Sequence, residues 1–336
     1  MSATRQIVVA DIGGTHARFA IATIEGDGSI ALSEPETLRT EDYGSFGTAW
    51  ARFCDMQGGA LPDAAALAIA GRADEEVIRF TNNPWTIRAD GIASELSVSQ
   101  WSIVNDFEAV AHAVAHTPDE ELVHLAGPAN ALAEDGTISI LGPGTGLGVA
   151  HLRRFETGYE VQSTEGGHIG FAPLDAVDDA ILARLRRRYD RVSVERVVSG
   201  PGIVEIHRAL AAGAGRDEEG PDHVEIWRRG IAGEDRLATA AVERFCLTLG
   251  SVAGDIALAQ GGFGGVVIAG GLGYRLREIL PRSGFAERFT AKGRFSGLMA
   301  TIPVKLIVHP QPGLLGVAAA FAGQHLGARG RPPSSR

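Results

Sequence analysis

The sequence predicts an α/β fold of two domains, and three observations support this prediction. Short apolar, β-branched runs alternate with longer helical patterns, an order typical of sheets covered by helices. The chain has 336 residues, which corresponds to about two domains of ordinary size. A strand, a glycine-rich turn and a second strand occur twice, and Gly14-Thr15 of the first copy aligns with Gly144-Thr145, 130 residues later. We interpret this as a weak internal repeat with one copy in each domain.

The first part of the chain predicts a hairpin, two further strands and a helix. Gln6–Ala10 and Phe19–Thr23 are apolar runs on either side of the glycine-containing turn Asp11–Thr15, which indicates a β-hairpin. The remaining elements expected here are two strands and an alanine-rich helix, over Ala64–Ala70, Ile103–Val104 and Phe107–His116.

The second part of the chain contains the longest helical pattern. This pattern covers Glu234–Gln260 and is interrupted by Gly250 and Gly254, because glycine lowers helix propensity. A hairpin is expected over Thr137–Leu141 and Leu147–Leu152, around the turn Gly142–Gly146. Two strands follow at Val266–Ala269 and Val304–Val308, and the chain then forms a turn at Pro310–Gly313 and a closing helix at Leu314–Gly323.

Composition and charge narrow the class of protein. Apolar residues make up 45% and charged residues 21%, values typical of a globular protein. The net charge of −10 disfavours nucleic acid as a main partner, because phosphate backbones bind basic surfaces. Two cysteines exclude a disulfide scaffold and a cysteine-cluster metal site.

Hydropathy and the chain ends lead to three further expectations. No run of about 18 apolar residues occurs, so we expect no membrane span. The first apolar run, Ile7–Ala10, is too short for the core of a signal peptide, and a cytoplasmic location is therefore expected. The end of the chain, 327–336, is rich in Gly, Pro, Ser and Arg and is predicted to be disordered.

Two common phosphate-binding signatures are absent from the sequence. A Walker A loop needs a glycine directly before a lysine, and neither Lys292 nor Lys305 follows one. The segment Gly142–Gly148 has glycines at every second residue, which is not the Gly-x-Gly-x-x-Gly pattern. Nucleotide binding would therefore need another architecture.

The two glycine-rich hairpin turns offer such an architecture. Glycines allow backbone N–H groups to converge on an anion, and Thr15 and Thr145 each add a hydroxyl donor. Asp11 lies at a strand end, where a carboxylate could bind Mg²⁺ directly or through water. Either turn alone is more simply explained as an ordinary hairpin, but the pair with Asp11 favours a site for a polyphosphate.

These turns resemble known phosphate loops. Asp11–Thr15 resembles the first phosphate loop of the sugar-kinase, heat-shock-70 and actin superfamily, Leu141–Gly148 resembles the second, and Gly270-Gly271 resembles its adenosine motif. The resemblance implies ATP contacts at Ala10, Asp11, Ile12, Gly13, Gly14, Thr15, Gly142, Gly144, Thr145, Gly146, Gly270 and Gly271.

Other segments resemble bacterial glucokinases more specifically, in order, over almost the whole chain. They are Thr81–Trp85, Val104–Phe107, Glu165–His168, Glu195–Gly202 and Pro312–Gly316. The resemblance implies two ribonuclease-H-like (actin-like ATPase) domains, with a ligand cleft between them. We expect a small domain over 1–117 and 310–330 and a large one over 118–309, and the resemblance suggests a homodimer. The activity implied is ATP-dependent phosphorylation of glucose at its 6-hydroxyl.

The matched motifs also imply roles for individual residues. Asp106 would act as the general base that takes the proton of the attacking hydroxyl, and Asn105 beside it would bind sugar hydroxyls. Taken alone, an Asn-Asp pair at a strand-to-helix junction would indicate a helix N-cap. The remaining glucose contacts implied are Asn83, Glu165, His168 and Glu195.

Two positions depart from the family pattern. His16 follows Gly-Gly-Thr where the family commonly has Asn, and Gly170 stands where it commonly has Asp. A separate feature, His112 and His116 at i and i+4, has the spacing of a zinc pair, but without a third ligand it more simply indicates a plain helix face.

Other classes of protein share part of this pattern. Repressor, open-reading-frame and kinase proteins share some motifs, but two distant cysteines cannot supply their zinc motif, and the first strand begins too early for their helix-turn-helix. A kinase for another hexose, such as mannose or an N-acetylhexosamine, stays open, as does a non-catalytic sugar sensor of the actin-like class.

Overall fold

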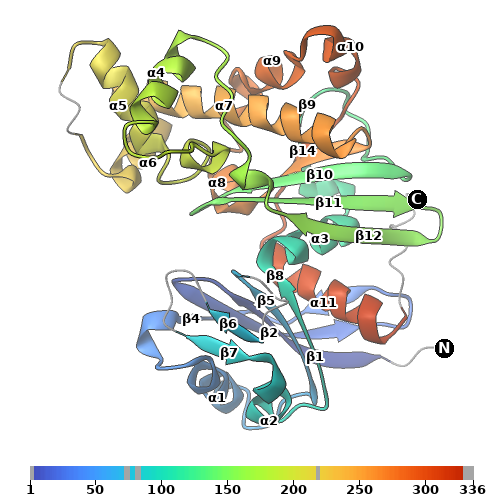
Figure 1. Ribbon diagram of the computed structural model, residues 1–336. Coiled ribbons are helices and arrows are strands. Elements are labelled where there is room, and N and C mark those ends of the chain that lie inside the picture. The colour runs from blue at the N-terminus through green and yellow to red at the C-terminus, as the bar shows by residue number, and fades with distance from the viewer. Residues whose placement is uncertain (1–3, 72–75, 80–84, 217–219, 328–336) are drawn as a thin grey trace. The chain divides into compact units, whose positions relative to one another are not determined.

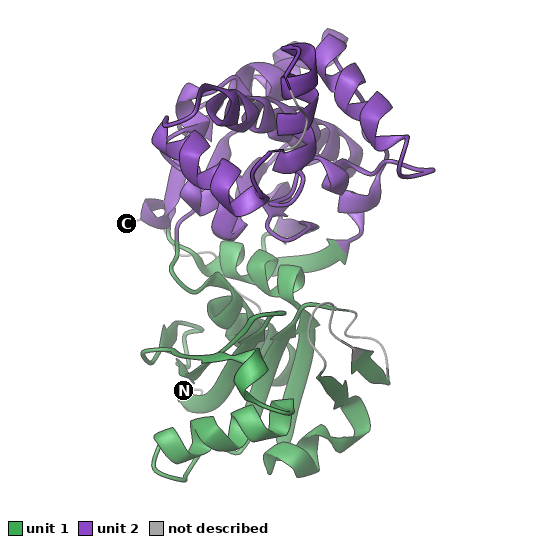
Figure 2. Ribbon diagram, turned by 90° about the vertical axis from the view of Figure 1, so that its left-hand side faces the viewer, with its two compact units in different colours: residues 1–118, 155–163, 309–336 green, residues 119–154, 164–308 purple. Residues whose placement is uncertain are grey.

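The computed structural model describes residues 4–71, 76–79, 85–216 and 220–327. It divides into two compact units, one of residues 1–118, 155–163 and 309–336 and the other of residues 119–154 and 164–308 (Figure 2). The domain boundaries expected from the sequence stay a prediction. Asn83 and most of the Thr81–Trp85 motif lie outside the described residues, as does most of the segment 327–336.

The first unit is built on a sheet with the strand order β3-β2-β1-β5-β8. The strands β1 and β2 form an antiparallel hairpin, β3 and β4 pair with β2, and β5 and β8 continue the sheet in parallel. Their bounds are β1 Arg5–Ile12, β2 His16–Ile24, β3 Ile30–Leu32, β4 Glu36–Arg39, β5 Ala64–Ile69 and β8 Gln100–Asn105.

Both faces of this sheet are buried. Successive side chains of a strand point to opposite sides, so each strand contributes to two cores. In β1, Ile7 and Val9 join a core with the helix α11 (Pro312–His325), whereas Val8 and Ile12 join a core with α1 (Phe46–Met56) on the other face. The near-continuous apolar runs of β1 and β5 follow from this double coverage. The other elements of the unit are η1 Thr40–Asp42, β6 Val77–Arg79, β7 Thr86–Arg88, η2 Ala89–Gly91, α2 Ile92–Leu96 and α3 Asp106–His116.

The second sheet has the strand order β12-β11-β10-β13-β14-β9. The pair β10–β11 is antiparallel, β13 and β14 follow in parallel, and β9 closes the edge in antiparallel orientation. The bounds are β9 Leu122–Ala126, β10 Gly136–Pro143, β11 Leu147–Phe155, β12 Gly158–Thr164, β13 Gly265–Ile268 and β14 Val304–Ile307.

Helices cover the second sheet, and Figure 1 shows α7 (Arg236–Gln260) as the longest of those labelled. This helix contacts β10 and β13 as well as three other helices, α5, α6 and α9. The remaining elements are η3 Asp119–Glu121, η4 Gly166–His168, α4 Ala176–Leu185, η5 Val194–Arg196, α5 Ile203–Gly213, α6 His223–Ala232, α8 Gly270–Arg275, η6 Leu280–Arg282, α9 Phe285–Thr290, η7 Gly293–Phe295 and α10 Ser296–Met299.

The two sheets share one arrangement, which confirms the internal repeat predicted from the glycine turns. In each, a central strand (β1 or β10) pairs antiparallel with the strand that follows it and parallel with a later strand (β5 or β13). A further parallel strand follows, β8 or β14.

Within the described residues, none of the helices has both the length and the apolar character needed to cross a bilayer.

Two sequence expectations about glycines were wrong. The helix α7 runs without a break through Gly250 and Gly254. A Cβ at Gly254 would lie 2.6 Å from the carbonyl oxygen of Phe289, so these glycines allow α9 to pack closely and do not interrupt the helix. The expected turn over Pro310–Gly313 ends earlier, because Pro312 and Gly313 already form the first turn of α11, where proline is favoured.

Close packing of α3 against α11 positions the start of α3, which is Asp106 (Figure 1). A Cβ at Gly316 of α11 would overlap the carbonyl oxygen of Ala109 in α3. Small residues at this crossing, among them Ala109, Ala113 and Gly316, let the two backbones approach. The position of Asp106 therefore depends on a glycine about 200 residues further along the chain.

We predict that Gly316→Ala lowers the free energy of unfolding by about 1–3 kcal/mol or more, since the added methyl group forces α3 and α11 apart. Thermal unfolding measures the effect. Gly323→Ala is the matched control on the same helix: a Cβ there meets nothing within 4 Å, so it should stabilise the protein by about 0.5–1 kcal/mol through helix propensity. Equal stability of the two variants would contradict the packing argument.

Candidate functional site

The first glycine turn connects β1 to β2 and is held by backbone and side-chain contacts. The amide of Gly13 donates to the carbonyl oxygen of His16 over 2.9 Å. Thr40, buried in the unit, donates its hydroxyl to the carbonyl oxygen of Gly14 at 2.8 Å and its amide to that of Thr15 at 3.0 Å. The contact of His16 uses its backbone, which explains how the turn keeps its shape with histidine at this position.

Asp11 stands at the end of β1 and faces Arg18. The two residues are direct partners in the hairpin register, and Arg18 Nη1 lies 3.3 Å from Asp11 Oδ2. A Cβ at Gly313 would lie 2.8 Å from the same oxygen, so the start of α11 also packs against this carboxylate. Burial raises the pKa of Asp11, while the charge and hydrogen bond of Arg18 act in the opposite direction.

Asn105 and Asp106 lie at the same edge of the sheet as this turn. Ile12 of β1 is in register with Ile69 of β5, and Ile69 is in register with Asn105 of β8. The carboxyl ends of the three strands therefore lie side by side, at a spacing of about 5 Å from strand to strand. Asp106, the first residue of α3, is half-buried there.

Asn105 caps α3, as the alternative interpretation of the Asn-Asp pair held. Its Oδ1 accepts from the amides of Phe107 at 2.9 Å and Glu108 at 3.3 Å, and its Nδ2 donates to the carbonyl oxygen of Gly71 at 3.0 Å. Nδ2 carries two hydrogens, of which this bond uses one. The predicted sugar contact is therefore compatible with the cap and stays a prediction.

The second glycine turn connects β10 to β11 and meets the predicted adenosine motif. The amide of Gly144 donates to the carbonyl oxygen of Gly146 at 2.8 Å, and Gly142 pairs with Gly148 in the hairpin. Gly270, with φ of +81°, lies against this hairpin, since a Cβ there would lie 3.1 Å from the carbonyl oxygen of Pro143. The structure thus brings together Gly142–Gly146 and Gly270-Gly271 within the second unit.

The two predicted sugar motifs of the second unit also lie next to each other. Gly170 forms an isolated β-bridge with Ser193, and the amide of Val194 donates to the carbonyl oxygen of Ile169 at 2.9 Å. This pairing places Glu165–His168 beside Glu195. Nothing lies within 4 Å of a Cβ at Gly170, so glycine replaces the family's acidic residue there without a packing requirement.

Both predicted sugar motifs pack on the start of β11, which follows the second glycine turn. Leu147 donates its amide to Glu195 Oε2 at 2.9 Å. A Cβ at Gly166 would lie 2.8 Å from Val149 Cγ1, and one at Gly167 would overlap the carbonyl oxygen of Leu147. Glu165 and His168 are themselves exposed, with 3.7 Å between Glu165 Oε2 and His168 Nε2. The Glu195 carboxylate therefore lies at the glycine turn, and the segment Glu165–His168 packs on the strand that follows it. Carboxylates and an imidazole near such a turn are suited to a polyhydroxylated ligand beside a phosphate.

Comparison with known proteins assigns this arrangement to a family. A family model described as Glucokinase matches residues 8–324. The chain is 53% identical over 320 residues to the glucokinase of Zymomonas mobilis subsp. mobilis. The match covers 95% of this chain and 98% of that protein. The chain belongs to the glucokinase family.

Solved structures agree with this family and confirm the predicted fold class. The crystal structure of a glucokinase from an Antarctic psychrotroph has a TM-score of 0.84 and 35% identity, and the match covers 95% of this chain and 99% of that one. A glucokinase of the repressor, open-reading-frame and kinase family from Streptomyces griseus, solved with glucose and AMPPNP, has a TM-score of 0.60 at 17% identity, with 95% and 99% covered. The second match shows the fold alone, that of two actin-like ATPase domains.

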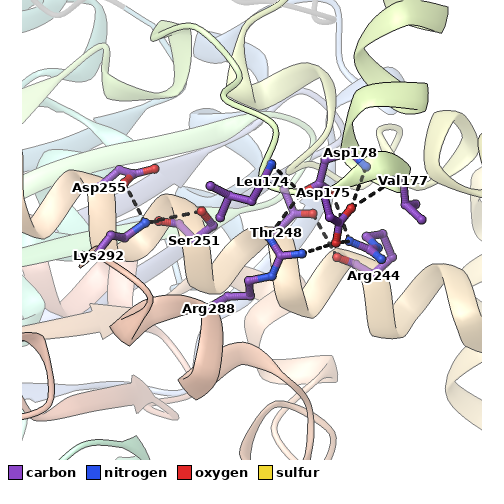
Figure 3. A network of polar contacts seen from close by, with 10 residues as sticks. All are labelled: Leu174, Asp175, Val177, Asp178, Arg244, Thr248, Ser251, Asp255, Arg288 and Lys292. Carbon is purple, nitrogen blue, oxygen red and sulfur yellow. Dashed lines mark hydrogen bonds and ion pairs between the residues drawn. The ribbon is translucent and has the colours of Figure 1, made fainter. Parts of the chain in front are cut away.

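In this glucokinase-family protein, a network of charged side chains fixes the start of α4, a few residues after the predicted sugar motif Glu165–His168 (Figure 3). Asp175 caps α4, and Asp178 accepts from the amide of Leu174 at 3.2 Å. Arg244 of α7 lies 2.6 Å from Asp175 and 3.3 Å from Asp178, and Arg288 of α9 contacts the same two carboxylates. Burial raises the pKa of Asp175, but hydrogen bonds and charges, those of Arg244 foremost, lower it to about 2.

His112 and His116, expected from the sequence to lie on a plain helix face, both contact one tyrosine of a neighbouring strand. His112 Nδ1 lies 3.0 Å and His116 Nε2 3.1 Å from the hydroxyl of Tyr159 in β12. A phenol carries one proton, so it can donate to one ring and accept from the N–H of the other. Among the described residues, no group of three or more His, Cys, Asp or Glu side chains could hold a metal ion.

Sequence reasoning missed Arg18, Thr40, Tyr159 and the Leu147 amide. Arg18 could have been found, because a hairpin with its turn at 13–15 sets Asp11 opposite Arg18. The other three contacts join segments that are 25 or more residues apart, and nothing local in the sequence indicates them.

We predict that His112 makes the stability of the protein depend on pH between about 6.5 and 4. Burial, together with the charge of His116, lowers the pKa of His112 from 6.5 to about 4. The unfolded chain therefore binds a proton in this range while the folded chain does not, so the free energy of unfolding falls as the pH falls, by at most about 3 kcal/mol. Asp175 acts in a separate range, since its contribution is present above about 4 and is lost toward pH 2.

Chemical unfolding at a series of pH values measures this slope. His112→Gln should flatten it between pH 6.5 and 4, whereas His223→Gln, which removes an exposed histidine, should leave it in place. An unchanged slope in His112→Gln would contradict the assignment.

Proposed function

We propose that the protein is a glucokinase, which transfers the γ-phosphoryl group of ATP to the 6-hydroxyl of glucose and yields glucose 6-phosphate and ADP. The observation that carries the proposal is the packing of two segments, Glu165–His168 and the one that contains Glu195, against each other and on the start of β11, directly after the second glycine turn. The names of the relatives support glucose as the substrate, and the complex of the Streptomyces griseus protein with glucose and AMPPNP supports ATP as the donor.

Phosphoryl transfer requires mainly positioning and electrostatic stabilisation. The attacking hydroxyl must lose its proton, and a carboxylate within hydrogen-bond distance can accept it. We assign this role to Asp106, because α3 begins there at the edge of the sheet that also carries the first glycine turn. The cap made by Asn105 fixes the backbone of α3 directly before this carboxylate.

Sugar recognition depends on acceptors and donors at fixed spacing. Glu165 and Glu195 would accept hydrogen bonds from sugar hydroxyls, and His168 can donate or accept according to its tautomer. Asn83 and Asn105 are proposed as further sugar contacts. A site built to satisfy hydroxyls discriminates strongly against analogues that lack them, because its own polar groups would be left without partners.

The two glycine turns are the proposed phosphate contacts, from Ala10, Asp11, Ile12, Gly13, Gly14 and Thr15 in the first and from Gly142, Gly144, Thr145 and Gly146 in the second. Gly270 and Gly271 would border the adenosine. Mg²⁺ bound with the nucleotide would neutralise phosphate charge. The structure fits an indirect role for Asp11, since Arg18 already contacts this carboxylate and disfavours direct coordination.

The setting of the activity is proposed from the same resemblance. A cytoplasmic homodimer that supplies glucose 6-phosphate to glycolysis is the arrangement that the family resemblance suggests. The reaction class is that of an ATP:D-glucose 6-phosphotransferase.

We predict that Asp106→Asn lowers kcat by about 100-fold or more with little change in glucose affinity, because the amide keeps a hydrogen bond but cannot take a proton. Steady-state kinetics and glucose titration measure the two effects. Glu108→Gln, two residues further along α3, is the matched control and should stay within about threefold of the unmodified protein. An Asp106→Asn variant with a tenth of the original kcat, a loss of only about 1.4 kcal/mol, would remove Asp106 from this role.

The choice of sugar is tested by a coupled assay with glucose, mannose, N-acetylglucosamine and N-acetylmannosamine. We expect kcat/KM for glucose to exceed that for each of the others by at least about tenfold, or about 1.4 kcal/mol. A preference for mannose or an N-acetylhexosamine would replace glucose in the proposal. Binding of sugar without turnover of any of the four would instead indicate a non-catalytic sensor.

A further inference from the structure

Glu195 contacts the second glycine turn directly. Its Oε2 accepts the 2.9 Å hydrogen bond from the amide of Leu147, the first residue of β11. A Cβ at Gly146 would overlap the same oxygen, so a larger residue at this position would displace the carboxylate from its present place at the turn. One residue that the proposed function assigns to the sugar is therefore also bonded to the turn that it assigns to the phosphates.

The segment that carries Glu195 is attached to this turn at a second point. The amide of Gly200 donates to the carbonyl oxygen of Gly144 at 2.7 Å, and a Cβ at Gly200 would lie 3.0 Å from that oxygen. The indole of Trp227 in turn donates to the carbonyl oxygen of Gly200 at 2.9 Å. Because the turn is bonded to one segment at both of its ends, a change at Glu195 must reach the turn.

The negative charge of Glu195 determines how this connection would affect phosphate binding. A carboxylate beside the turn repels a polyphosphate and already accepts one of the amide hydrogens there. The next residue in the sequence, Arg196, is a cation, and its guanidinium lies over the ring of Tyr189 at 4.1 Å. Sugar hydroxyls that donate to Glu195 would spread its charge and weaken the repulsion.

We propose that Glu195 couples the two substrate sites: a sugar bound to this carboxylate increases the affinity of the second glycine turn for a nucleoside triphosphate. The coupling is reciprocal, so the nucleotide increases the affinity for the sugar by the same factor. Glu195 thus acts on the phosphates as a positioning residue in addition to its sugar contact. The inference rests on the proposed function and deepens it.

Calorimetric titration of AMPPNP with Mg²⁺, without and with saturating glucose, tests the coupling. In the unmodified protein, glucose should lower the Kd of AMPPNP by at least about fivefold. In Glu195→Gln, AMPPNP alone should bind more tightly than to the unmodified protein, and glucose should change its Kd by less than about twofold. Glu165→Gln is the control, because Glu165 has no bond to the turn among those described: it should weaken glucose binding but keep the coupling.

Glu195→Asp provides a second variant if Glu195→Gln fails to fold. Its shorter side chain keeps the charge but cannot reach the Leu147 amide from the same backbone position, and it too should show less than about twofold coupling. An equal AMPPNP Kd with and without glucose in an unmodified protein that phosphorylates glucose would overturn the inference and leave the proposed function in place. Retention of full coupling in either Glu195 variant would overturn it as well. Absence of glucose phosphorylation by the unmodified protein would overturn the proposed function itself.

Discussion

Close approach of backbone at glycines is the constraint on which the site of the second unit depends. At Gly146, Gly166, Gly167 and Gly200, a Cβ would overlap or lie within 3.0 Å of the neighbouring segment. Side chains at these positions would separate Glu165–His168 and Glu195 from the turn between β10 and β11. The proposed binding of one ligand by these polar groups therefore depends on how closely their segments approach the turn and β11.

Close approach at glycines also positions the predicted site residues of the first unit. Gly313 allows the start of α11 to reach Asp11, and Gly316 allows α11 to reach α3. The helix α11 thus contacts the carboxylate at the end of β1 and supports the helix that begins at Asp106. The high glycine content, 44 of 336 residues, is consistent with a fold in which the proposed site residues lie where helices and strands pack closely.

The parts of the fold that local sequence determines were predicted correctly. Both hairpins follow from apolar runs on either side of glycines. The Asp11–Arg18 pair was not predicted, although the hairpin register sets these two residues opposite each other. The break expected at Gly250 and Gly254 was wrong, because propensity describes an isolated helix and takes no account of α9 packed against these glycines. For the site, the motifs predicted the candidate residues, but the Leu147–Glu195 bond and the Tyr159 contacts depend on tertiary placement.

A crystal structure of the protein with glucose and AMPPNP tests the account most directly. We expect Glu165, His168 and Glu195 to contact sugar hydroxyls and the Asp106 carboxylate to lie about 3 Å from the 6-hydroxyl, opposite the terminal phosphate. Glucose bound elsewhere, or the Asp106 carboxylate out of hydrogen-bond reach of the 6-hydroxyl, would contradict it.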